Sequence, residues 1–234
     1  AKVNKIKFEN EIRNTESQIK IFQSELKKLM NVEYTIIPAD DLKFDEIILS
    51  QDNLLKKAYS NNPELTMSRF QRQKFSNKRS LSKSELFPSF SFRYYNQKIG
   101  GENGFWGFEI GLGIPLWFWW EQTGNIKEAD YEYRIASSDE IGIRKNIESE
   151  LDQSYVDYQN SLRQLKFFRD EAIKESDEIL RQAKIGYEEG AIDYVEYLQA
   201  LNVSYDTKTQ YLNSIFSYKN SIIRLEKITA GEIK

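Results

Sequence analysis

Hydrophobic and polar positions follow two different periods along this chain, and the change between them predicts its organisation. In the second half, small or apolar residues recur at alternating steps of three and four, the pattern of a helix packed along one face. The pattern runs from Thr123 to Tyr187, which corresponds to a rod of about 100 Å at ~1.5 Å per residue. The predicted inward positions are Ile126, Ala129, Tyr133, Ala136, Ile143, Ile147, Leu151, Ser154, Tyr158, Leu162, Leu165, Ala172, Ile179 and Ala183.

A second helix is predicted to return along the first. Gly186 and Gly190 are expected to end the long helix, and Asp193 is suited to cap the next one. The returning helix has an expected inner face of Val195, Leu198, Leu201, Tyr205, Leu212, Ile215, Ile222 and Leu225. The result would be an antiparallel helical hairpin whose tip consists of Glu188, Glu189, Gly190, Ala191, Ile192 and Asp193.

Between Pro88 and Trp120 the period is two, which predicts β-strands. Phe90, Phe92 and Tyr94 alternate with small or polar residues in the first run. In the second run, Trp106, Phe108, Ile110, Leu112 and Ile114 alternate with Gly107, Glu109, Gly111 and Gly113. A glycine-rich loop from Lys98 to Gly104 joins the runs into a β-hairpin, and the aromatic block Trp117, Phe118, Trp119 and Trp120 follows it.

An alternating hairpin can be half-buried in a soluble domain or can cross a membrane. Each run has the ~9–11 residues with which a tilted strand spans a bilayer. The aromatic block follows where such a strand would leave the hydrocarbon. We therefore interpret the apolar residues Trp106, Phe108, Ile110, Leu112 and Ile114 as lipid-facing. The aromatic block would then lie at the membrane interface. Two strands cannot close a barrel, so further strands must come from the same polypeptide, other subunits, or both.

The remaining segments complete the predicted organisation. Residues 1–31 form a helix with Ile12, Ile19, Phe22, Leu26 and Leu29 on one face. This helix resembles the end of the chain, which suggests the end of a preceding repeat in a longer protein. A connector at 32–51 leads to helices at 52–87, one of them opened by Pro63 after Asn62. The hairpin region spans 88–120, the long helix 121–190 and the returning helix 191–234.

Composition excludes several kinds of function. The chain has no Cys and no His, so thiol nucleophiles, imidazole bases and Cys/His zinc sites are absent, and we expect no metal site and no cofactor. A net charge of −3 offers no basic surface for nucleic acid. With a mean hydropathy of −0.64 and no long apolar run, no transmembrane helix is predicted. Glu188 and Glu189 are adjacent and point apart, so no enzyme is expected.

The motifs together resemble those of the TolC-family outer-membrane efflux proteins, over nearly the whole chain. Asn62-Pro63-Glu64-Leu65 is similar to the family's NPxL helix start, and Phe87-Pro88-Ser89-Phe90 to its strand start. Gly113-Ile114-Pro115-Leu116-Trp117 resembles the strand end. Farther along, Gly124-Asn125-Ile126, Ala129, Ala183, Tyr187, Gly190, Leu198, Ala200, Tyr211-Leu212, Tyr218, Leu225-Glu226 and Gly231 fall at the family's spacings.

The resemblance implies a fold that is mainly α, with a long antiparallel helical hairpin of the tube type and two strands of a transmembrane barrel. It implies a homotrimer in the bacterial outer membrane with its helices in the periplasm. It further implies a periplasmic adaptor (membrane fusion protein) at the helical tip and an inner-membrane pump, with the resistance-nodulation-division type as a candidate. Glu196 and Gln199 fall on positions that constrict the periplasmic aperture in the family. From the same topology, the loop from Lys98 to Gly104 would lie outside the cell.

Three alternatives remain open from the sequence. Tyrosines at 194, 197, 205 and 211 resemble the heavy-metal efflux branch, although Met30 and Met67 are the only sulfur-containing residues. A conduit for type I protein secretion would have the same channel, because the cargo is chosen elsewhere. A soluble coiled-coil scaffold would have the same helices without lipid. The expected function is that of a passive exit duct for small molecules delivered by a pump.

Overall fold

The computed structural model describes residues 2–38, 44–114 and 119–233 and divides into two units, residues 1–43 and 44–234. The first unit contains helix α1 (Lys2–Met30), which ends as predicted next to Asn31. Asn31 has a positive φ of 52°, and the amide of Val32 donates to the carbonyl of Lys27, which closes the helix end. Within this unit the predicted apolar face remains largely exposed, including Leu29.

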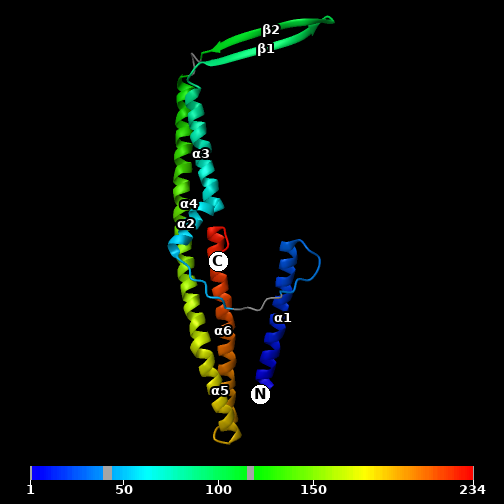
Figure 1. Ribbon diagram of the computed structural model, residues 1–234, viewed down its shortest axis with the longest axis vertical. Helices are drawn as coiled ribbons and strands as arrows, with labels where there is room; N and C mark the ends of the chain where they lie inside the picture. The colour runs from blue at the N-terminus through cyan, green and yellow to red at the C-terminus, as the bar shows by residue number, and fades with distance from the viewer. Residues whose placement is uncertain (1, 39–43, 115–118, 234) are drawn as a thin grey trace. The chain divides into compact units, whose positions relative to one another are not determined.

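The second unit is built from long helices that pack side by side in antiparallel pairs (Figure 1). Helix α2 (Gln51–Asn61) precedes α3 (Pro63–Ser84), which lies along the first part of α4 (Trp119–Phe167). A π-helical turn η1 (Phe168–Ala172) joins α4 to α5 (Ile173–Glu188). Helix α6 (Tyr194–Thr229) returns along α5 and the last part of α4.

Polar pairs hold the α3–α4 contact, because this pair buries mainly small side chains. Ala129 and Ala136 are buried on α4. Around them, cross-helix ion pairs join Arg72 to Glu140 at 2.6 Å, Lys78 to Glu132 at 2.6 Å and Arg79 to Asp130 at 2.9 Å. The sums of these residue numbers are nearly constant, as expected for antiparallel helices in register.

The hydrophobic core lies where α2 and the start of α3 meet α4 and α6. Its buried members are Leu54, Ala58, Leu65, Ile147, Leu151, Tyr158, Leu165, Ile215, Tyr218, Ile222, Leu225, Ile228 and Ile233. Asn62 joins these helices at one point. Its side-chain oxygen accepts from the amides of Glu64 (3.0 Å) and Leu65 (3.1 Å), and its side-chain nitrogen donates to the carbonyl of Ile228 (3.0 Å). The predicted helix start at Asn62-Pro63 is therefore correct, and it also fixes the end of α6.

The predicted long helix is correct in position but is interrupted. At η1 one extra residue enters the turn, and the amide of Ile173 donates to the carbonyl of Phe168. From Ala129 to Leu165 the predicted seam is buried, except that Tyr133, Ile143 and Leu162 are half-buried, whereas Ile179 beyond the turn is 43% exposed. Beyond the turn Ser176 is buried and the predicted positions Ala172 and Ala183 are half-buried, so the seam continues on small residues.

The predicted inner face of α6 is correct near its C-terminal end and wrong near the tip. Ile215, Ile222 and Leu225 are buried, whereas Val195 and Leu212 are more than half exposed. Leu201 and Tyr205 are also exposed. Close to the tip the buried positions belong to Ala200 and Ser204, because small side chains let two helix backbones approach closely. Leu198 is half-buried, whereas Val195, Leu201 and Tyr205 remain exposed.

Strand β1 (Ser89–Ile99) pairs antiparallel with β2 (Glu102–Gly113). The strands extend into the predicted loop, and Gly100 and Gly101, with φ of 63° and 89°, make the reversal. Both residues have the positive φ that a tight hairpin turn requires. At the other end of the hairpin region, helix α4 already begins at Trp119, so the backbone of Trp119 and Trp120 is helical; Trp117 and Phe118 lie outside the described residues.

Across the described ranges, none of the helices combines the length and the apolar character needed to cross a membrane. The same residues hold no group of three or more acidic side chains arranged to bind a metal ion.

Candidate functional site: the helical tip and the aromatic hairpin

The strand register places the alternating residues of both strands on common faces. Directly opposite residues in an antiparallel pair share a face. Phe90 pairs with Leu112, and Phe92 pairs with Ile110. The further pairs on this face are Tyr94 with Phe108 and Asn96 with Trp106. The predicted apolar residues of β2 therefore lie together with the aromatic residues of β1 on one continuous face.

In the part of the chain that the structure describes, no other segment covers this apolar face. The exposed fractions include 81% for Phe90 and 73% for Ile110, and Trp106, Phe108, Leu112 and Ile114 are all more than half exposed. Contiguous apolar patches of this kind mark a surface that meets another protein or a lipid phase. The face thus needs a partner that the two strands do not supply.

The opposite face of the hairpin is built mainly from small and polar residues, with Phe105 at the end near the turn. Arg93 and Glu109 are directly opposed and form an ion pair at 3.2 Å. Tyr95 lies over Gly107 so closely that a Cβ at Gly107 would be 2.5 Å from the tyrosine hydroxyl. Aromatic cover of a cross-strand glycine protects the exposed backbone there. The sequence pattern predicted the glycine face but gave no signal for this tyrosine cover.

The tip between α5 and α6 has a defined backbone. Helix α5 ends with Gly190 at a φ of 76°, and the amides of Ala191 and Ile192 donate to the carbonyl of Gly186 at 2.7 and 3.2 Å. This is the hydrogen-bonding pattern of a helix that ends at a left-handed glycine. Ile192 then packs against Gly186, where an added Cβ would meet its side chain at 3.4 Å. The predicted role of Gly190 is confirmed.

Asp193 and Glu196 form a reciprocal capping box at the start of α6. One oxygen of Asp193 accepts from the amides of Val195 (2.8 Å) and Glu196 (2.9 Å), and the Glu196 carboxylate accepts from the amide of Asp193 (3.2 Å). The cap at Asp193 was predicted, but the part played by Glu196 was missed, although the Asp-x-x-Glu spacing signals it. The structure places Glu196 and Gln199 on exposed positions of the first turns of α6.

Tyrosine rings hold the two helices together beside this cap. Tyr187 of α5 stacks on Tyr197 of α6 with ring centroids 5.3 Å apart and an interplanar angle of 16°. It also contacts Tyr194 at 6.0 Å. Four acidic residues lie close to these tyrosines in the sequence, namely Glu188, Glu189, Asp193 and Glu196. The tip is therefore an ordered, negatively charged end of the helical hairpin that carries exposed aromatic surface.

Solved structures with the same fold are outer-membrane proteins. The CmeC outer membrane channel of Campylobacter jejuni is 18% identical with a TM-score of 0.60, over 84% of this chain and 49% of that chain. The open-state MtrE outer membrane channel of Neisseria gonorrhoeae is 17% identical with a TM-score of 0.66, over 91% and 50%. The outer membrane protein VceC of Vibrio cholerae is 14% identical with a TM-score of 0.69, over 97% and 56%.

The fold is thus that of outer-membrane channel subunits, with helices and an antiparallel strand pair in one chain. The family model for outer membrane efflux proteins matches residues 54–231, which is most of the sequence. The chain belongs to the outer membrane efflux protein family. It spans about half the length of the channels named above, and no curated protein sequence matches it. The fold class expected from the sequence is confirmed for the helices and the hairpin.

Proposed function

We propose that this chain is part of an outer-membrane channel that serves as the passive exit duct of a tripartite efflux system. The observation that supports this proposal most directly is the β-hairpin. Its strand register gives a continuous exposed apolar face and an opposite face with small and charged residues. Strands in the wall of a transmembrane barrel need an apolar face toward the lipid and a polar face toward the lumen. Family membership supports export as the purpose of the channel.

In this proposal the apolar face meets the lipid of the outer membrane, and Gly107, Glu109, Gly111 and Gly113 line the lumen. The two strands require others to close a barrel, because unpaired strand edges cannot stand in hydrocarbon. A homotrimer with a second set of strands in the same polypeptide would supply them, with residues 1–31 as the end of the preceding repeat. The helices would then lie in the periplasm.

The tip is the proposed contact for a periplasmic adaptor that joins the channel to an inner-membrane pump. Its capping box, its left-handed glycine and its stacked tyrosines make it a fixed surface before any partner binds, which lowers the entropic cost of association. Glu196 is proposed to constrict the aperture together with Gln199. Three copies of one carboxylate near a threefold axis would attract cations.

Channel formation and orientation can be tested on the full-length protein. We expect it to need detergent for extraction and to give discrete conductance steps in planar bilayers, with loss of the gene raising sensitivity to small toxic compounds. A cysteine at Lys98 should react with an impermeant thiol reagent on intact cells, whereas a cysteine at Glu189 should not. A protein that stays in the aqueous phase, or labelling at Glu189 alone, would contradict the proposal.

A further inference from the structure

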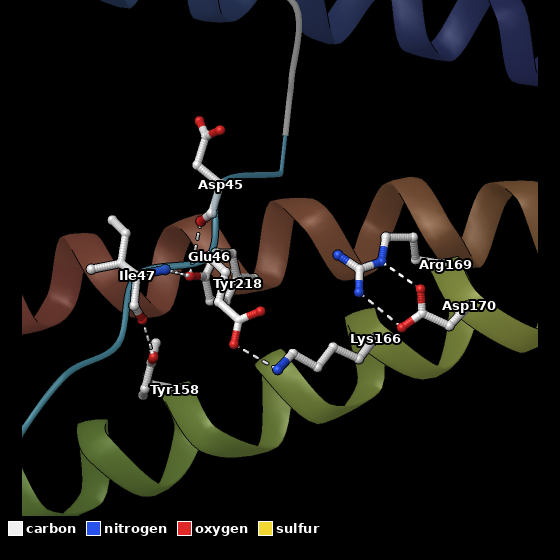
Figure 2. Close-up of polar contacts among 8 residues, drawn as sticks. All are labelled: Asp45, Glu46, Ile47, Tyr158, Lys166, Arg169, Asp170 and Tyr218. Atoms are coloured by element: carbon white, nitrogen blue, oxygen red, sulfur yellow. Dashed lines mark hydrogen bonds and ion pairs between the residues drawn. The ribbon is translucent and has the colours of Figure 1, made fainter.

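An irregular segment of residues 44–50, here termed the strap, crosses α4 and α6 and is held by tyrosine hydroxyls (Figure 2). The Tyr218 hydroxyl accepts from the amide of Ile47 at 3.0 Å and donates to the carbonyl of Asp45 at 3.2 Å. Tyr158 donates to the carbonyl of Ile47. Because the strap belongs to no helix or sheet, these side chains supply the hydrogen bonds that its backbone lacks.

The strap also reaches the π-helical turn. Glu46 forms an ion pair of 2.6 Å with Lys166, which lies just before the turn. The Arg169 guanidinium, inside the turn, lies 4.8 Å from the ring centroid of Phe44. Two hydrogen bonds to the Asp170 carboxylate, 2.7 and 2.8 Å long, orient this guanidinium, as Figure 2 shows. The strap and the turn therefore make one connected contact.

The π-helical turn separates two regions of unequal packing. On its α4 side, Leu151, Tyr158 and Leu165 are fully buried against α6 and α2. On its α5 side, Ser176 is the buried residue of the helix. A π-turn inside an α-helix is frequently found at a functional site, and weakly packed regions open first. The turn is thus the natural boundary between a firmly packed and a loosely packed part of the helical hairpin.

We propose that η1 is a hinge whose closed state is maintained by the strap. While Phe44 and Glu46 hold Arg169 and Lys166, α5 stays in its present register against α6. When the strap leaves, the turn opens and α5 rotates or slides against α6, carrying the tip with its caps intact. This inference rests on contacts within residues 44–234 and holds whichever partner the tip meets.

Hydrogen–deuterium exchange on the full-length protein, resolved by peptide mass spectrometry, tests the hinge. We compare the parent protein with Phe44→Ala and Arg169→Ala. The matched control is Arg181→Ala, because Arg181 makes the same kind of double hydrogen bond to Glu178, at 2.8 and 2.6 Å, within α5. Both test variants should raise exchange at residues 166–177 by about tenfold. Exchange at 129–151 should stay at the parent rate.

Arg181→Ala should leave residues 166–173 at the parent rate, within about twofold. The proposal is overturned if Phe44→Ala and Arg169→Ala behave like this control. An even rise over the whole of 129–229 would also overturn it, because Phe44 would then stabilise the entire unit and not the turn. Because Arg169 is partly exposed, its alanine variant is expected to fold and to keep the test decisive.

Discussion

At the scale of single residues, Asn62 links helices α3 and α6 with one side chain. It caps α3 through two backbone amides and holds the end of α6 through the carbonyl of Ile228. Asn62→Ala should lower the free energy of unfolding by about 1–3 kcal/mol, from the lost cap and the unpaired buried groups. Asn62→Asp keeps the cap and loses the donor, so its loss should be smaller. Urea denaturation measures both, and equal losses would mean that the cap of α3 contributes nothing beyond the contact with Ile228.

The strap tyrosines give a residue-scale prediction about pH. Burial is the main cause that raises the pKa of Tyr158 and of Tyr218 above the ordinary value of 10.0. The folded protein therefore keeps these protons after the unfolded chain would release them. The stability is fully present below pH 10 and falls as the pH rises above about 10. Thermal unfolding followed between pH 8 and 11 should show this decline. It should be smaller in Tyr158→Phe, which keeps the ring and removes the ionisable group; an unchanged slope would contradict the assignment.

At the scale of elements, the start of α6 combines a structural and a proposed channel role in Glu196. Glu196→Gln keeps an acceptor for the amide of Asp193 but removes the charge. It should reduce cation preference and divalent block in planar bilayers with unchanged stability, whereas Glu196→Ala should also lose about 0.5–2 kcal/mol. Gln199→Glu should strengthen both channel properties. Glu189→Gln, which removes a nearby charge outside α6, serves as the control.

An unchanged selectivity in both Glu196→Gln and Gln199→Glu would show that Glu196 is only a capping residue. A selectivity change of the same size in Glu189→Gln would show that selectivity depends on the total negative charge of the tip and not on Glu196 itself.

How far the sequence predicts these elements depends on whether the signal is local. Asn62-Pro63, Gly190 and Asp193 carry their own capping chemistry, so those helix ends were predicted. The alternation in β1 and β2 gave the hairpin, but the length of the turn depended on how far the strands pair. The π-helical turn η1 has no local signature, so the sequence predicted one uninterrupted helix. Ile179 was placed inward by the heptad-like period, but the seam there is formed by small residues and Ile179 is exposed.

Two features of the longer-range packing were not predicted from the sequence. The strap was predicted as an irregular connector, but its bonds to Tyr158 and Tyr218 join residues more than a hundred positions apart. On α6, large apolar side chains near the tip were assigned inward because burial usually follows size. Near the tip the small residues Ala200 and Ser204 are buried instead. When apolar residues occur on two sides of a helix, their period alone does not show which side packs against the neighbouring helix.

At the scale of the whole molecule, the proposed channel requires that the apolar face of the hairpin meets lipid and that the other face meets a polar lumen. The sequence has no cysteine, so single labels within this chain need no background substitution. The most direct test is the accessibility of nitroxide labels along the hairpin in the full-length protein reconstituted in bilayers. Labels at Phe108, Ile110 and Leu112 should collide with oxygen, and labels at Ser91 and Glu109 with a polar nickel complex. The account predicts this period-two alternation in both strands; equal access of the nickel complex to both faces would contradict it.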